Sequence, residues 1–165
     1  MIEVRRIKAN EAMISRDVRI RALTDAPYAF GGTLEDVLNQ PLQDFEDNAK
    51  RWSESEVSTS FLAFDNEKAV GMAGAFFEEG SNRAFLCAMW VEPEYRQSGV
   101  GKIIVKTVIS WLSERGADTV YAWVADANSN AIKFYQCLGF SATKEKEILA
   151  SNPDETETLF RFSCL

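Results

Sequence analysis

The sequence predicts a mixed α+β fold, in which a mostly antiparallel sheet of about seven strands is combined with helices. Three observations predict it. The first half ends in strands joined by short turns, as in an antiparallel meander. After Pro93 the pattern changes to strand, loop, helix, strand and helix, followed by two strands. No repeat, low-complexity tract or linker interrupts the 165 residues, so residues 1–165 form a single domain.

The N-terminal third begins with an alternating strand over residues 2–7. A helix over residues 10–23 follows, with Asn10 as its N-cap and Met13, Ile14, Val18 and Leu23 as its apolar side. Pro27 ends it, because the residue before a proline avoids helical angles. Thr33, with Asp36 three residues later, begins a second helical region that runs to about Trp52 and is interrupted near Pro41.

The central sheet is predicted from alternating and β-branched runs. Strands over residues 60–64 and 69–77 are joined by a hairpin turn at residues 65–68. A second turn at residues 80–82 leads into a strand over residues 83–91.

The second half contains two amphipathic helices. Residues 99–115 place Ile104, Val105, Val108 and Leu112 on one face, and Gly116 follows as a C-cap. A strand over residues 119–125 precedes a helix that Asn128 opens and Gly139 ends. Strands near residues 142–148 and 157–163 complete the sheet.

Composition excludes several classes of site. The chain has no histidine, which excludes Ser-His-Asp and Cys-His catalysis and His-ligated metals within one chain. Its three cysteines form no CxxC pair, so we expect no metal site. The net charge of −7 and the pI of about 4.7 argue against nucleic acid as a partner. They are mildly compatible with a cationic substrate.

Membrane and secretion signals are also missing from the sequence pattern. No run approaches the roughly 18 apolar residues of a membrane helix, and residues 1–6 have no apolar signal-peptide core. We therefore expect a cytoplasmic protein without a membrane partner.

The segment that carries chemistry is Met89–Lys102, where a strand runs through a glycine-containing loop into a helix N-terminus. Unpaired N–H groups and the positive end of the helix dipole make such a place an anion site. Arg96 and Lys102 add positive charge.

Four interpretations of this loop compete. A nucleotide P-loop requires Ser or Thr after Gly-Lys, but Ile103 follows Lys102. A dinucleotide fingerprint requires a third glycine where the chain has Ile104. An ordinary tight turn explains the glycines alone. The pattern Arg/Gln-x-x-Gly-x-Gly/Ala fits residues 96–101 completely.

Two motifs together resemble the GNAT family of N-acetyltransferases. Residues 91–101, VEPEYRQSGVG, are similar to the family's cofactor motif, and residues 128–140, NSNAIKFYQCLGF, are similar to its second motif. The interval between them and the order of elements over nearly the whole chain also fit. The resemblance implies a three-layer α+β or α/β fold, with helices on both faces of the sheet.

The resemblance further implies acetyl-coenzyme A as the cofactor. Main-chain groups of the strand before the loop would pair with pantetheine, and loop N–H groups would bind the pyrophosphate. Asn128, which also suits an N-cap, would contact the cofactor from the next helix. The implied cofactor set is Met89, Trp90, Val91, Arg96, Gln97, Ser98, Gly99, Val100, Gly101, Lys102, Asn128 and Ala131.

For catalysis the resemblance implies direct attack of an amine on the thioester, without a covalent enzyme intermediate. Tyr135 matches the tyrosine that protonates the leaving thiolate, and a phenol with a pKa of about 10 stays protonated at neutral pH. The general base is open, because residues 84–91 contain no carboxylate. Glu78 is our catalytic candidate, and Glu79, Glu35 or a water relay are alternatives.

On the acceptor side, the resemblance implies that the first two helices form one wall of the cleft. Phe30, Gly31 and Glu35 are the expected substrate-binding residues, although core packing would equally explain Phe30. We expect a small-molecule or peptide amine, with a polyamine suggested by the acidic charge. Family members frequently form homodimers. A non-catalytic acyl-CoA sensor and a nucleotide-binding module are the competing functions.

Overall fold

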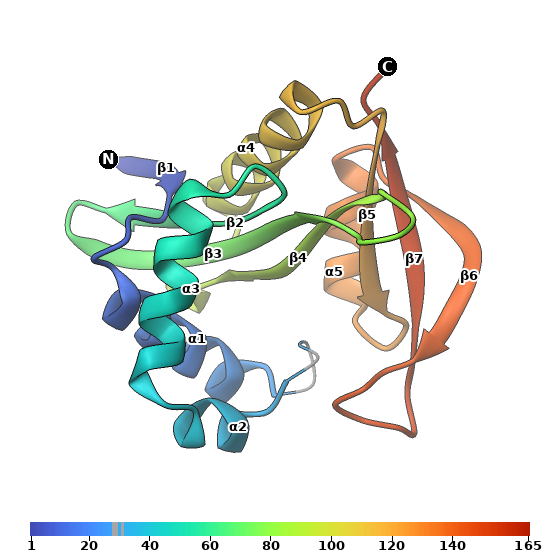
Figure 1. The fold of residues 1–165 in the computed structure, drawn as a ribbon. Coiled ribbons are helices and arrows are strands. Elements are labelled where there is room, and N and C mark those ends of the chain that lie inside the picture. The colour runs from blue at the N-terminus through green and yellow to red at the C-terminus, as the bar shows by residue number, and fades with distance from the viewer. Residues whose placement is uncertain (28–29, 31) are drawn as a thin grey trace.

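The computed structural model describes residues 1–27, 30 and 32–165. Its centre is a seven-stranded sheet in the order β1-β2-β3-β4-β5-β7-β6 (Figure 1). All neighbouring strands are antiparallel except β4 and β5, which are parallel. The strands are β1 (Ile2–Arg6), β2 (Ser58–Asp65), β3 (Lys68–Phe77), β4 (Ala84–Val91), β5 (Thr119–Ala125), β6 (Ser141–Ile148) and β7 (Thr156–Ser163).

Helices cover both faces of this sheet, which confirms the predicted three-layer fold. One face carries α1, α2 and α3, and the other carries α4 and α5. A short 3-10 helix, η1, lies in the loop before α4. The bounds are α1 (Ala12–Asp25), α2 (Leu34–Asn39), α3 (Leu42–Glu54), η1 (Pro93–Tyr95), α4 (Val100–Glu114) and α5 (Ser129–Cys137). None of the helices in the described ranges is long and apolar enough to cross a bilayer.

The predicted break near Pro41 is confirmed, and so is the helix start at Thr33. The Thr33 hydroxyl accepts from the Asp36 N–H at 3.1 Å, and the Asp36 carboxylate accepts from the Thr33 N–H at 3.4 Å. This reciprocal capping box satisfies two N–H groups that a helix start leaves without partners.

The predicted start of the first helix is wrong. Asn10 is not the N-cap, because α1 begins at Ala12 with Glu11 before it. The buried Glu11 carboxylate accepts from the Lys8 N–H at 2.7 Å and from both guanidinium NH groups of Arg5. Met13 is 56% exposed rather than on the apolar side. The helix therefore turns its Val18 and Leu23 side toward the sheet, and Met13 faces solvent.

Alternation along β3 divides the apolar interior into two clusters. Gly71 faces α4, since a Cβ atom there would lie 2.9 Å from the Ile104 side chain. Its neighbour Met72 belongs to the cluster beneath α1 and α3. Each face of the sheet thus has its own hydrophobic core, and a ligand bound on either face would contact the sheet.

Strands β4 and β5 separate soon after they begin. They pair only at Ala84 with Val120 and at Phe85 with Tyr121, and Figure 1 shows them diverging from that point. Beyond Phe85, the edge of β4 that faces β5 has no ladder partner among the described residues. The β3–β4 ladder shifts register opposite Met72 and Gly74, and Ala88 has a φ of 49°. Such a bulge re-aims the backbone, in this case beside an opening between two strands.

Candidate functional site

The loop before α4 presents its backbone N–H groups to solvent. Gln97 and Gly99 have φ values of 63° and 91°, the left-handed region that turns successive N–H groups to one side. None of the N–H groups of residues 97–102 donates a well-formed hydrogen bond to another described residue. They stand at the N-terminus of α4, where the helix dipole adds positive potential. The loop therefore offers the N–H donors and the positive potential that an anion site requires.

The first turn of α4 lies against α5 and β4. A Cβ atom at Gly101 would lie 3.1 Å from the Phe134 ring and 3.4 Å from the terminal methyl group of Met89. Only glycine permits this approach without displacement of the ring. The close contact brings three segments of the two predicted motifs to one place, beside the opening between β4 and β5.

The two cations of the loop have different surroundings. The Arg96 guanidinium forms an ion pair with Asp25 and donates to the Val91 carbonyl at 2.9 Å. Much of its charge is therefore already compensated within the protein. Lys102 lies exposed on the first turn of α4, and it forms no ion pair within the described ranges.

The predicted cofactor residues on β4 lie along the open edge, but their side chains differ in direction. Trp90 is buried, and its indole N–H donates to Asp25 at 3.0 Å on the α1 side of the sheet. Only main-chain atoms of Trp90 can therefore face a ligand on the β5 side. The Val91 carbonyl already accepts from Arg96.

Asn128 caps α5, and Tyr135 lies within this helix. The Asn128 side-chain oxygen accepts from the Ala131 N–H at 3.0 Å, which confirms the N-cap. The Tyr135 ring packs edge-on against Phe134 and Phe140, with centroids 5.2 Å apart in both pairs. Its hydroxyl takes part in none of the side-chain hydrogen bonds of the described residues, and burial raises the pKa of the phenol. The group is thus held protonated with its donor unused.

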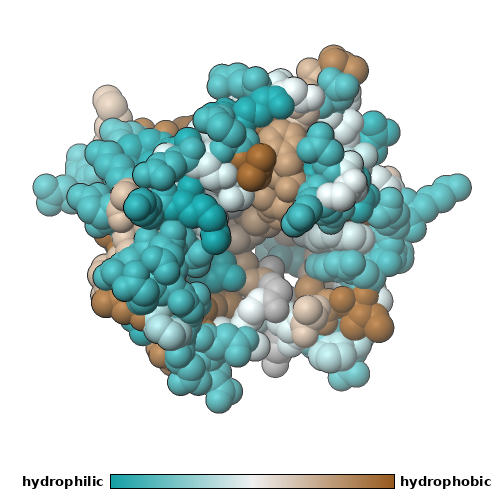
Figure 2. Space-filling model, viewed as in Figure 1, coloured by the Kyte–Doolittle hydropathy of each residue, from teal (hydrophilic) through white to brown (hydrophobic). Residues whose placement is uncertain are grey.

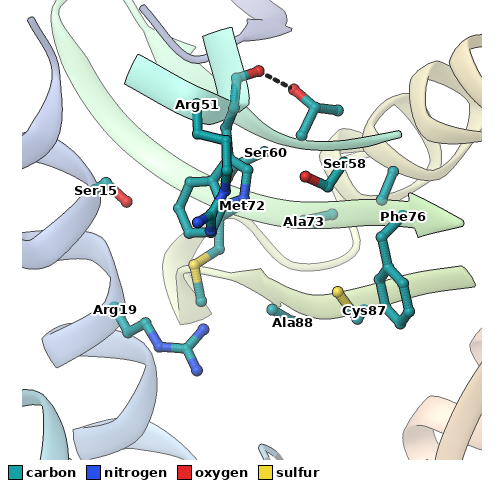
Figure 3. A pocket seen from close by; sticks show the side chains of 14 residues that line it. Ser15, Arg19, Arg51, Ser58, Ser60, Met72, Ala73, Phe76, Cys87 and Ala88 are labelled. Carbon is teal, nitrogen blue, oxygen red and sulfur yellow. Dashed lines mark hydrogen bonds between the residues drawn. The ribbon is translucent and has the colours of Figure 1, made fainter. Parts of the chain in front are cut away.

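A cavity of about 320 Å³ lies on the other face of the sheet, between α1 and α3. Figure 2 shows the molecule hollowed at the centre of this view, between its α1–α3 side and its β5–β7 side. Figure 3 shows the Arg19 side chain reaching from α1 toward β4, and Arg51 lying above Met72. The lining residues are Ser15, Arg19, Arg51, Trp52, Ser58, Thr59, Ser60, Met72, Ala73, Gly74, Ala75, Phe76, Cys87 and Ala88.

Cys87 marks where this cavity meets the opening in the sheet. Its side chain is accessible to solvent, yet it sits among sheet atoms that desolvate it and raise the pKa of the thiol to about 11. Cys87 and Arg19 line this cavity together, and the Arg19 side chain reaches into it from the α1 side (Figure 3).

The expected acceptor residues lie elsewhere. Phe30 is buried at 5% exposure in the core beneath α1 and α3, which favours the packing explanation. Gly31 lies outside the described residues. Glu35 is exposed in the first turn of α2. Neither Phe30 nor Glu35 lines the cavity.

The proposed base, Glu78, is held in the turn between β3 and β4. Its carboxylate accepts from the Ser81 hydroxyl at 2.6 Å and lies 3.6 Å from the Arg83 guanidinium. It is not among the residues that line the cavity.

Sequence reasoning missed the polar residues of this cavity. Ser15 and Arg19 are four residues apart and share one side of α1, whereas Arg51 and Trp52 come from α3. The i,i+4 spacing of the first pair was a usable signal. The two pairs line one cavity because α1 and α3 pack beside each other, and no local sequence pattern predicts that packing.

A family model and several curated proteins are similar to this chain. Residues 21–140 match the family model described as the acetyltransferase (GNAT) family. Human N-acetyltransferase 8 is 29% identical over 104 residues, which are 61% of this chain and 46% of that protein. The chain thus spans less than half the length of this curated relative.

Two solved structures share the fold over almost their whole length. A GNAT-family acetyltransferase from Streptococcus pneumoniae has a TM-score of 0.79 at 16% identity, with 99% of each chain covered. The PaiA N-acetyltransferase from Thermoplasma acidophilum, solved in complex with coenzyme A, has a TM-score of 0.76 at 14% identity, again with 99% of each chain covered.

Proposed function

This chain belongs to the GNAT acetyltransferase family, and we propose that it transfers an acetyl group from acetyl-coenzyme A to the amine of a small molecule or peptide. The observation that carries the proposal is the row of unpartnered N–H groups at residues 97–102, which stands beside the unpaired edge of β4. The likeness to a structure solved with coenzyme A is consistent with it.

The residues present fit this donor. A pyrophosphate needs several N–H donors and positive potential, and both are available at the start of α4. Pantetheine carries amide groups that can pair with a free strand edge, and β4 has one beyond Phe85. The residues that would hold the donor are Met89, Val91, residues 97–102 and Asn128. Trp90 would contribute only main-chain atoms. Arg96 would contribute indirectly, because its guanidinium is paired with Asp25.

Acetyl-coenzyme A would supply an acyl group activated as a thioester, which a neutral amine can attack directly. The backbone N–H near Met89, beside the bulge at Ala88, would stabilise the negative charge that develops on the carbonyl oxygen. Tyr135 would give its hydroxyl proton to the departing thiolate, since its donor has no other described partner. Binding and orientation of both substrates would supply most of the remaining acceleration.

The amine must reach the thioester without its extra proton. No carboxylate is among the described residues that line the cavity, which supports removal of that proton by water. Glu78 remains the alternative base, although it lies in an ion pair with Arg83.

The function is tested by titrating the protein with acetyl-coenzyme A and then measuring thiol release with a panel of amines. We expect binding, turnover with at least one amine, and a ternary-complex kinetic pattern. Binding without turnover on any amine would support an acyl-CoA sensor instead. Greater thermal stabilisation by ATP or NAD than by coenzyme A would support a nucleotide-binding module.

A further inference from the structure

We propose that the acceptor is a small amine that also carries an anionic oxygen group, carboxylate or phosphate, held in the α1–α3 cavity by Arg19 and Arg51. The inference rests on the proposed function and names its acceptor class. It differs from the cationic acceptor that the net charge of −7 suggested.

Arg19 is the strongest reason for an anionic ligand. Its guanidinium forms no ion pair or hydrogen bond with any other residue in the described ranges, and desolvation lowers its pKa. A half-buried cation without a partner is unfavourable, and five N–H donors in a planar fork match a carboxylate or phosphate. A ligand oxygen would give this group the partner that those ranges do not.

The other residues that line the cavity also favour an anionic ligand. Arg51 adds a second guanidinium, and its one described hydrogen-bond partner is the neutral side chain of Asn48, at 2.8 Å. Ser15, Ser58 and Ser60 contribute hydroxyl groups that can donate to an anion. With no carboxylate among the described lining residues, the local charge is positive although the whole chain is acidic.

The position and size of the cavity suit an acceptor. Cys87 and Ala88 belong to its lining, and Ala88 also lies in the bulged part of β4, directly before Met89. An amine that points along β4 from Cys87 and Ala88 would reach Met89 at the opening between β4 and β5. A volume of about 320 Å³ is at the low end for a small-molecule site, and it fits a compact ligand rather than a long polyamine.

The test compares pairs of amines with and without the anionic group. Rates are measured with α-amino acids against their amides, with phosphoethanolamine against ethanolamine, and with spermidine. We expect the better anionic amine to exceed its neutral counterpart by about tenfold in kcat/KM, as a charge-assisted hydrogen bond predicts. The two pairs show whether carboxylate or phosphate is preferred.

Substitutions at Arg19 test whether the preference for anionic amines arises in the cavity. Arg19→Gln should abolish the anionic preference while leaving the Kd for acetyl-coenzyme A unchanged, and Arg19→Lys should restore part of it. Arg16→Gln is the matched control, because Arg16 lies on the same helix over the Phe45 ring and does not line the cavity. An undiminished preference in Arg19→Gln would refute the role of Arg19.

Calorimetric titration with the same amines and their N-acetylated forms separates this inference from the proposed function. Turnover confined to spermidine and the neutral amines would overturn the inference and leave the acetyltransferase proposal standing. If no amine turned over, the proposed function would fail, and the binding of the anionic ligands would decide whether the anionic site exists. Arg19-dependent binding of the anionic ligands would support the anionic site, and its absence would overturn it.

Discussion

The hydroxyl of Tyr135 is the single group whose loss should affect chemistry most. We expect Tyr135→Phe to lower kcat by about 100-fold, since a positioned general acid contributes roughly 10²–10⁴. The Kd for acetyl-coenzyme A should change little, because the ring contacts with Phe134 and Phe140 remain. Steady-state kinetics and a binding titration measure the two effects.

Tyr121→Phe provides the control for that substitution. Tyr121 lies on β5 with its ring 5.8 Å from Phe85 and beneath the Arg83 guanidinium. It should keep near-normal kcat. Equal turnover in Tyr135→Phe and the native protein would remove Tyr135 from the mechanism.

Glu78 separates the two routes for the amine proton. Because its carboxylate is engaged with Ser81 and Arg83 outside the cavity, we expect Glu78→Gln to change kcat/KM by less than about threefold, within the range of surface substitutions. The pH profile should keep rising toward the pKa of the free amine. A loss near 100-fold, with an acidic limb removed from that profile, would instead identify Glu78 as the base.

At this scale the sequence predicts residues whose role follows from a local motif. Asn128 is such a residue, since its N-cap follows from the local pattern. The role of Tyr135 was inferred from the family resemblance and stays a prediction. Arg19 and Arg51 are not, because their shared cavity joins residues 32 positions apart. Trp90 lies between these cases: its strand was predicted, but the direction of its indole depends on Asp25 of α1.

Among the elements, the loop before α4 can be tested with two glycines of nearly equal conformation. Gly99 has a φ of +91° and Gly80 a φ of +92°, and neither has an atom within 4 Å of an added Cβ. Alanine at either position should cost about 1–2 kcal/mol of folding free energy, because left-handed angles are unfavourable for residues with a Cβ. Thermal unfolding measures this shared cost.

Only Gly99→Ala should also affect the donor. Its loop carries the free N–H groups at residues 97–102, whereas Gly80 lies in the turn between β3 and β4. We expect a Kd for coenzyme A at least about tenfold weaker in Gly99→Ala, as for a lost charge-assisted hydrogen bond, and unchanged in Gly80→Ala. Equal binding in the two variants would place the anion site elsewhere.

Element bounds were largely readable from the sequence. The strand predicted over residues 119–125 is β5, and the predicted helix over residues 99–115 is α4 with one residue fewer at each end. Turn residues and amphipathic spacing decide these limits locally. The early separation of β4 from β5 follows from no local pattern, because strand pairing depends on residues distant in sequence.

For the whole molecule, the net charge does not describe the charge of the cavity. A balance of −7 describes the average surface, whereas recognition depends on the few charges within reach of a ligand, since exposed charges are screened over about 10 Å at 0.1 M salt. The chain keeps two arginines and no described carboxylate in its cavity. Its acidic groups gather elsewhere, including a pair on the last two strands.

That pair is Glu147 on β6 and Glu157 on β7, which lie directly opposite each other. Burial, the neighbouring Glu147 and then Asp126 raise the pKa of Glu157 to about 8. Asp126 is ionised readily, because Thr156, Thr158 and Lys146 stabilise its charge and lower its pKa. Like charges on facing strand positions are unfavourable, so the folded state keeps a proton on the pair.

The stability of the whole domain should therefore depend on pH through this pair. An unfolded glutamate titrates near 4.3, and the folded pKa is higher, so the folded state binds the proton more tightly. The stabilisation is complete below about pH 4 and is lost as the pH rises to about 8. Glu157→Gln should thus raise the Tm relative to the native protein more at pH 8.5 than at pH 5. Glu155→Gln, in the same hairpin, should show no such difference. A constant gap between Glu157→Gln and the native protein at both pH values would show that Glu157 ionises normally in the fold.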